Sequence, residues 1–90
     1  MADLRQAFGI VLKKARNSIP MTQEELALKS GCYASDISEF ENGKISPTIN
    51  KAHDIIWALG FTLSDFFNDV EQEYRRQQST TSSDEVTRGG

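Results

Sequence analysis

The stretch TQEELALKSGCYASDISEFENG, residues 22–43, predicts two short helices joined by a tight turn. Thr22 with Glu25 three residues later forms a capping box, the signature of a helix start. Gly31 is suited to the left-handed backbone that ends a helix. A second helix is expected from Tyr33 to Glu41, where Asn42-Gly43 ends it. The stretch therefore predicts two helices held at an angle by a glycine turn.

Further helices are expected on both sides of this stretch. Pro20 ends a first helix, over residues 3–17, whose apolar residues recur at helical spacing. Ser46-Pro47-Thr48 starts a fourth helix, and Thr62 with Asp65 starts a fifth. No segment alternates as a strand does. The sequence predicts an all-α, compact five-helix domain, with apolar faces formed by Leu4, Phe8, Val11, Leu12, Ala15, Ala52, Ile55, Ile56, Leu59, Leu63, Phe66 and Phe67.

Composition predicts one small domain, residues 1–70, followed by a polar tail, residues 71–90, that is expected to be largely disordered, or helical only at its start. The net charge of −3 argues mildly against nucleic acid. Bases and acids balance over residues 1–63, however, and local potential matters more than net charge. Without an apolar run of membrane length or a signal peptide, the protein is expected to be cytoplasmic.

The polar chemistry argues against an enzyme. Cys32 and His53 are the single cysteine and histidine, so a disulfide framework, a metal site and a catalytic set are all excluded, and no cofactor is expected. Cys32 is interpreted as a buried, inert thiol, with a redox sensor as the alternative. His53 is interpreted as a surface residue, with a ligand or pH switch as the alternative.

Five stretches carry a family resemblance, in an order and spacing that need no insertion. Residues 8–67 resemble the Cro/phage-repressor (Xre-type) helix-turn-helix family. The resemblance implies a lambda-repressor-like fold, a third helix in the major groove, a homodimer on double-stranded DNA, and a bacterial or phage origin. The stretches are LKKAR (12–16), TQEELA (22–27), SG (30–31), ISEFENGKISP (37–47) and ALGFTLSDFF (58–67).

The third helix is expected to present a polar face to DNA. At about 100° per residue, Tyr33, Ile37 and Phe40 fall on the side that faces the body. Glu39, on the opposite side, can accept a hydrogen bond from cytosine N4. Tyr33 stands where the family usually has a small residue, so either the helix starts near Ser35 or Tyr33 itself contacts DNA. The predicted base-contacting residues are Tyr33, Ala34, Ser35, Ser38 and Glu39.

The other two acids of this helix are given structural roles. The carboxylate of Asp36, at the third helical position, interacts favourably with the exposed N–H groups and the dipole at the helix start. The resemblance implies that Glu41 pairs with Arg16 of the first helix. It also implies phosphate contacts by Gln23 and by the loop after the third helix. The predicted phosphate-contacting residues are Gln23, Asn42, Lys44, Asn50 and Lys51.

An aromatic group predicts a protein interface. Trp57 points away from the apolar face of its helix, close to the aromatic residues of the fifth helix. Exposed aromatic side chains commonly mark interfaces. We interpret the group as a dimer interface, with packing under the C-terminal segment as the alternative. The predicted interface residues are Trp57, Phe61, Phe66 and Phe67.

Together these features predict a sequence-specific regulator of transcription, most simply a repressor that acts as a dimer on a near-palindromic operator. The alternatives within this class are an antitoxin of a toxin–antitoxin pair and a restriction–modification controller protein. RNA polymerase or a toxin could then be contacted through the tail. The alternative from another class is a protein-interaction module that kept the fold without DNA binding, and the acidic third helix is its main support.

Overall fold

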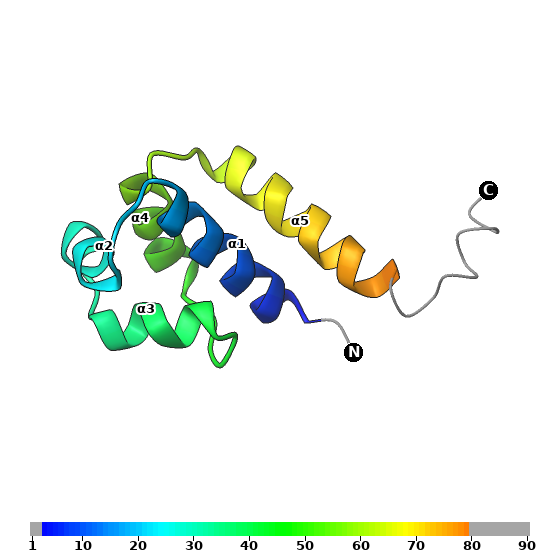
Figure 1. The fold of residues 1–90 in the computed structure, drawn as a ribbon, viewed down its shortest axis with the longest axis horizontal. Helices are drawn as coiled ribbons and strands as arrows, with labels where there is room; N and C mark the ends of the chain where they lie inside the picture. The colour runs from blue at the N-terminus through cyan, green and yellow to red at the C-terminus, as the bar shows by residue number, and fades with distance from the viewer. Residues whose placement is uncertain (1–2, 80–90) are drawn as a thin grey trace.

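The computed structural model describes residues 3–79, and it confirms the five-helix, all-α fold (Figure 1). No strand occurs within the described range. The helices follow one another through short connections, as the sequence predicts. They are α1 (Leu4–Ser18), α2 (Gln23–Ser30), α3 (Ala34–Glu41), α4 (Ile49–Ala58) and α5 (Leu63–Ser79).

Side-chain caps set the helix starts that the sequence predicts. The Thr22 hydroxyl accepts from the Glu25 N–H, and the Glu25 carboxylate accepts from the Thr22 N–H, which completes the capping box. Thr48 and Thr62 cap α4 and α5 in the same way, each accepting an N–H three residues on. Gly31 ends α2 with a φ of 74°, in the left-handed region where glycine carries no steric penalty.

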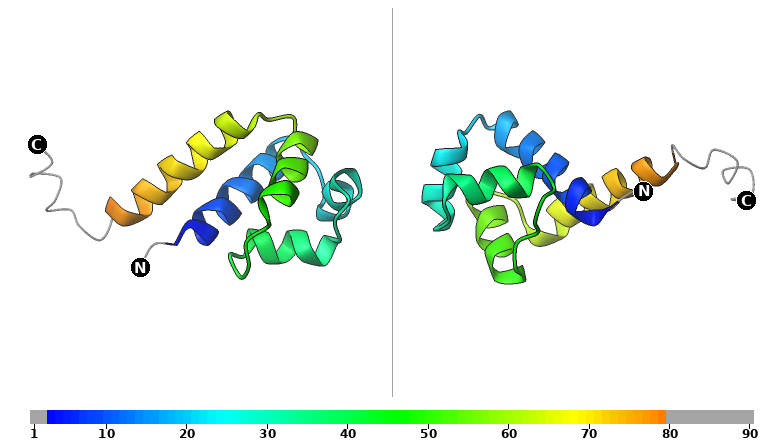
Figure 2. Two further views of the ribbon diagram at one scale, coloured as in Figure 1. Left: turned by 180° about the vertical axis from the view of Figure 1, so that it is seen from behind. Right: turned by 90° about the horizontal axis from the view of Figure 1, so that it is seen from below.

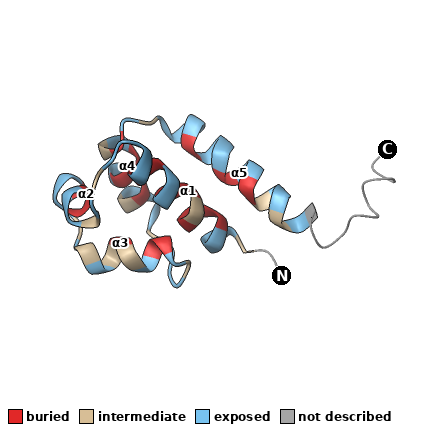
Figure 3. Ribbon diagram, in the orientation of Figure 1, coloured by how far each residue is buried: buried red, intermediate tan, exposed pale blue. Residues whose placement is uncertain are grey.

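Every helix contributes to one core. In Figures 1 and 2, α1 and α5 lie side by side and antiparallel, while α2, α3 and α4 form the other end of the molecule. Buried residues line the inner sides of these helices (Figure 3). The largest fully buried side chains are Leu12, Leu26, Ile37, Ile55, Ile56 and Phe66.

A glycine lets α1 and α3 approach closely. A Cβ placed on Gly9 would lie 2.5 Å from the carbonyl oxygens of both Phe40 and Glu41. Such a distance is a clash with backbone, so any side chain here would push the two helices apart. Gly9 therefore fixes how near the end of α3 lies to α1.

The last helix is longer than the sequence analysis predicted. α5 continues to Ser79, so the boundary expected at residue 70 falls within a helix, and the tail is helical at its start, over residues 71–79, which is one of the two expectations. Val70 and Glu73 are buried against α1, because the apolar spacing of α5 continues past its first two turns. The remaining tail, residues 80–90, to which contacts with RNA polymerase or a toxin were assigned, lies outside the described residues.

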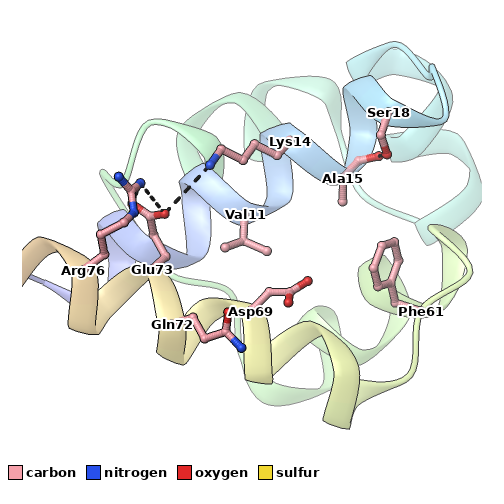
Figure 4. A pocket seen from close by; sticks show the side chains of 9 residues that line it. All are labelled: Val11, Lys14, Ala15, Ser18, Phe61, Asp69, Gln72, Glu73 and Arg76. Carbon is pink, nitrogen blue, oxygen red and sulfur yellow. Dashed lines mark hydrogen bonds and ion pairs between the residues drawn. The ribbon is translucent and has the colours of Figure 1, made fainter.

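Glu73 attaches this extension to α1. Its carboxylate accepts from the guanidinium of Arg76 at 2.7 Å and lies 3.9 Å from the ammonium of Lys14 (Figure 4). The hydrogen bond from Arg76 is the main reason why the pKa of Glu73 is lowered, with Gln77 and Lys14 adding to the effect. The charged carboxylate is thus stable in the groove between α1 and α5.

A buried ion pair joins α1 to α3. The Nε of Arg16 donates to Oε2 of Glu41 at 2.6 Å, and Nη2 donates to Oε1 at 3.0 Å. This two-point geometry is the strongest that arginine makes with a carboxylate, and it raises the pKa of Arg16. The pair that the resemblance implied is therefore present.

The pair also reaches α2. Nη1 of Arg16 donates to the carbonyl oxygen of Met21 at 2.8 Å, just before α2 begins. The side-chain amide of Gln23, the first residue of α2, donates to Oε1 of Glu41 at 3.0 Å. Three helices thus meet at one carboxylate, and α3 is held in a fixed orientation.

Removing one partner of this pair should destabilise the fold severely. Arg16→Met and Glu41→Leu each leave a buried charge without its partner, and each should cost about 3–5 kcal/mol of unfolding free energy in urea denaturation. The double variant should cost much less than the sum of the two, because no unpaired charge remains. The exposed pair Glu71–Arg75 is the matched control, where each alanine variant should cost about 0.5 kcal/mol or less. Additive losses at Arg16 and Glu41 would contradict the account.

Candidate nucleic-acid interface

The structure shows where α3 starts, which the sequence left open. The helix begins at Ala34 with Tyr33 as its N-cap, in extended backbone and with no hydrogen bond from the Tyr33 side chain. A start at Ser35, which would rotate the face, is therefore wrong. Placing Tyr33 with the body-facing residues is wrong as well, because its side chain is 77% exposed. An N-cap residue lies outside the helical periodicity, so the 100° rule does not apply to it.

The outer side of α3 is polar and carries one fully exposed acid. Ile37 and Phe40 are buried against the body, as their spacing predicted. Glu41 is buried in its pair with Arg16, and Asp36 is half-buried in the first turn of the helix. The residues that remain accessible on the outer side are Ser35, Glu39 and Asn42, which are exposed, with Ala34 and Ser38 half-buried.

Most of the polar residues predicted to contact phosphate follow the C-terminal end of α3. Asn42 and Lys44 are exposed on the loop that follows α3, and this loop leads to Asn50 and Lys51 in the first turn of α4 (Figure 2). Asn50 is exposed and Lys51 is half-buried. The main-chain N–H groups at the start of α4 add partial positive charge beside these side chains.

Gln23 has a role that sequence reasoning missed. Its amide nitrogen donates to Glu41, so one of its two N–H groups is already used inside the protein. The second N–H remains for an outside acceptor. Because Gln23 is also the first residue of α2, a phosphate bound there would be coupled directly to the Arg16–Glu41 pair.

The predicted dimer residues do not form one patch. Trp57 is 74% exposed, and Phe61 and Phe67 are partly exposed, but Phe66 is fully buried. The rings of Phe8, Phe61 and Phe67 surround Phe66 at centroid distances of 5.3–6.0 Å, so Phe66 belongs to the core. The sequence assigned Phe66 to the interface because neighbouring aromatic residues cannot be told apart by spacing alone.

Two exposed apolar residues were not assigned to the interface. Ile49 is 69% exposed at the start of α4, where it lines a groove with residues of α1 and α5 and not the groove of Trp57. Leu63, at the start of α5, lines the same shallow groove as Trp57 and Phe61.

The described residues offer no site for other chemistry. No group of three or more His, Cys, Asp or Glu residues in the range 3–79 could hold a metal ion. His53 is exposed and its Nδ1 lies 3.2 Å from Asp54. Cys32 is half-buried rather than fully buried, with its sulfur 3.8 Å from the carbonyl oxygen of Ser30. None of the helices in this range is long and apolar enough to cross a bilayer.

Known proteins with the same arrangement are DNA-binding regulators. A helix-turn-helix family model matches residues 12–66. The control protein C.MunI of Mycoplasma is 35% identical over 74 residues, which are 81% of this chain and all of that protein. The transcriptional regulator PuuR of Escherichia coli is 30% identical over 99% of this chain, and the chain spans about half of PuuR, 48% of its length.

Solved structures show the same fold. The clp gene regulator ClgR of Corynebacterium glutamicum superimposes with a TM-score of 0.85 at 25% identity, over 93% of this chain and 89% of that one. The restriction–modification controller protein C.Esp1396I superimposes with a TM-score of 0.74 at 32% identity, over 81% and 94%. This chain belongs to the helix-turn-helix family of DNA-binding transcriptional regulators and is not an enzyme.

Proposed function

We propose that the protein binds a specific duplex sequence as a dimer and regulates transcription from it, most simply by repression. The observation that carries the proposal is the fixed orientation of α3. The buried Arg16–Glu41 pair and the close contact at Gly9 hold the inner side of α3, and the outer side is free to enter the major groove.

Base recognition is assigned to the accessible residues of α3. Glu39 is the acceptor for a cytosine N4 amino group, and its charge disfavours bases that present acceptor atoms there. Ser35 and Ser38 can donate or accept, and the methyl group of Ala34 can contact thymine. Tyr33, exposed at the very start of the helix, offers an aromatic ring and a hydroxyl to the same groove.

Phosphate binding is assigned to residues around α3 and supplies most of the affinity. Half or more of protein–DNA hydrogen bonds go to the backbone, from Lys and Arg, from amides and from helix N-termini. Gln23, at the start of α2, is hydrogen-bonded to Glu41 in the last turn of α3. Asn42, Lys44, Asn50 and Lys51 follow α3 along the loop and the first turn of α4. An acidic reading helix is compatible with DNA because these groups lie beside it.

Dimerisation is assigned to the exposed apolar residues around the junction of α4 and α5, namely Trp57, Phe61 and Phe67, with Leu63 added and Phe66 removed. If α4 starts at DNA through Asn50 and Lys51, then Trp57, near its other end, lies away from the DNA. A two-fold axis near Trp57 leaves both α3 helices free to read half-sites about 34 Å apart.

A role as a restriction–modification controller is favoured by one observation. The similarity to C.MunI extends over the whole length of that control protein, and C.Esp1396I is covered almost completely. The similarity to PuuR, in contrast, covers about half of that protein. We therefore place the controller role ahead of the antitoxin role.

Selection of bound sites from a random duplex pool tests the proposed function. The full chain should enrich a near-palindromic sequence whose half-sites are about 10 base pairs apart from centre to centre. Enrichment of nothing at low salt would overturn the proposal and favour a protein-interaction module. Enrichment of a single half-site would overturn the proposed dimer and leave the proposed DNA binding in place.

Replacing Glu39 and Lys44 should have different consequences. Glu39→Ala should remove about 1–3 kcal/mol of discrimination at one base pair per half-site, as measured by competition with single-base variants of the selected duplex. Lys44→Ala should weaken binding to all sequences and reduce the salt slope by about one unit. Equal losses on every sequence from both variants would contradict this division.

Replacing Trp57 should weaken the dimer. Trp57→Ala should raise the dimer dissociation constant about 30-fold, the equivalent of about 2 kcal/mol for an interface tryptophan, as measured by sedimentation equilibrium. Leu28→Ala is the matched control, because Leu28 is an apolar residue that is 84% exposed on α2 and is not assigned to the interface. An unchanged dimer fraction in Trp57→Ala would remove this residue from the interface.

A further inference from the structure

The start of α1 lies against the loop that follows α3. A Cβ added to Gly43 would lie 3.2 Å from the Cα and 3.1 Å from the Cγ of Gln6, so the loop rests on the first turn of α1. Gly43 adopts a φ of 73°, which directs the chain past this turn toward α4. Lys44, the next residue, is thereby placed beside α1 as well as beside α3.

Arg5 lies on this side of α1. It lines one groove together with Ser46 and Pro47, two of the four residues between Lys44 and the start of α4, and with apolar residues of α1, α4 and α5. Figure 2 shows the start of α1 and the loop after α3 on the same side of the molecule. Arg5 is thus a base next to the segment that carries Lys44 and Lys51, although it comes from a different helix.

The partner of Arg5 is an exposed carboxylate two residues away. Nη2 of Arg5 lies 3.0 Å from Oδ2 of Asp3, and the two side chains are 51% and 38% exposed. The hydrogen bonds between them lower the pKa of Asp3 and raise the pKa of Arg5, so both are charged at neutral pH. Exposed ion pairs of this kind are weak and are screened by salt.

We propose that Arg5 binds a DNA phosphate next to the one bound by Lys44, and that Asp3 holds the Arg5 guanidinium until the phosphate replaces it. The inference rests on the proposed DNA binding and extends the phosphate-binding surface from the loop onto α1. Guanidinium matches phosphate with two parallel hydrogen bonds, which an exposed lysine cannot make. Asp3 then lowers affinity, because its carboxylate competes with the phosphate for Arg5.

Asp3 also caps α1, so the test must remove its charge without removing this cap. Its Oδ1 accepts from the main-chain N–H of Arg5 at 2.8 Å, which caps α1. Asparagine caps a helix about as well as aspartate does. Asp3→Asn therefore removes the charge that competes for Arg5 and preserves the cap, and an unchanged unfolding transition checks this.

The chain offers a matched control pair for the experiment. Arg75 and Glu71 form an exposed ion pair at 2.9 Å on α5, remote from the loop after α3. Arg75→Ala changes the net charge as Arg5→Ala does, and Glu71→Gln changes it as Asp3→Asn does. An effect of overall charge on DNA binding would appear equally in the variants of both ion pairs. A difference between the two pairs would therefore report a local contact with DNA.

The test measures binding of the full chain to its selected duplex between 50 and 200 mM salt. Arg5→Ala should weaken binding to all sequences and reduce the salt slope by about 0.9, so its deficit is about three- to fourfold larger at 50 mM than at 200 mM. Asp3→Asn should tighten binding by up to about fivefold. Arg75→Ala and Glu71→Gln should keep the wild-type slope.

The outcomes separate this inference from the proposed function. If the wild-type chain selects and binds a duplex, but Arg5→Ala has the same slope as Arg75→Ala, the Arg5 contact is overturned and the proposed function stands. If Asp3→Asn tightens binding no more than Glu71→Gln does, the competition by Asp3 is overturned. If the wild-type chain binds no duplex, both the inference and the proposed function fail.

Discussion

The buried pair of Arg16 and Glu41 is the interaction on which the arrangement of the other parts depends. One carboxylate receives a guanidinium from α1 and an amide from Gln23 of α2, while it belongs to the last turn of α3. Two buried charges are stable together only when their geometry is close to ideal and the remaining polar atoms are satisfied. The pair therefore permits one orientation of α3 and penalises others. Gly9 adds a steric limit to the same contact, since its missing side chain is what allows α3 to lie so near.

This constraint also explains how an acidic helix can serve as a reading helix. Of the three acids on α3, Glu41 is buried and its charge is balanced by Arg16. Asp36 lies in the first turn, where the helix dipole favours a negative charge. Glu39 alone extends fully from the outer side. In the proposed complex, this single carboxylate selects among base edges in the major groove, and Lys44, Lys51 and Arg5 supply affinity around it. The acidity of α3 is thus compatible with sequence-specific binding.

The fold was predictable because its signals are local, and the misses came from features that depend on distant parts of the chain. Capping residues such as Thr22 and turn glycines such as Gly31 report on neighbouring backbone and were confirmed. The burial of Phe66 depends on three other rings, and the length of α5 depends on the groove along α1. Tyr33 was misplaced because an N-cap does not follow helical periodicity. The roles of the site residues in binding DNA stay predictions.

The most direct test of the central claim is a titration of the ¹⁵N-labelled full chain with its selected duplex, followed by amide chemical shifts. The account predicts large changes at the start of α2, along the outer side of α3 and in the loop that leads to α4. Arg16 and Glu41 should keep their contact, seen as an Arg16 side-chain Nε–H signal that remains slow to exchange. Changes confined to α4 and α5, with α3 unaffected, would contradict the claim that α3 enters the groove.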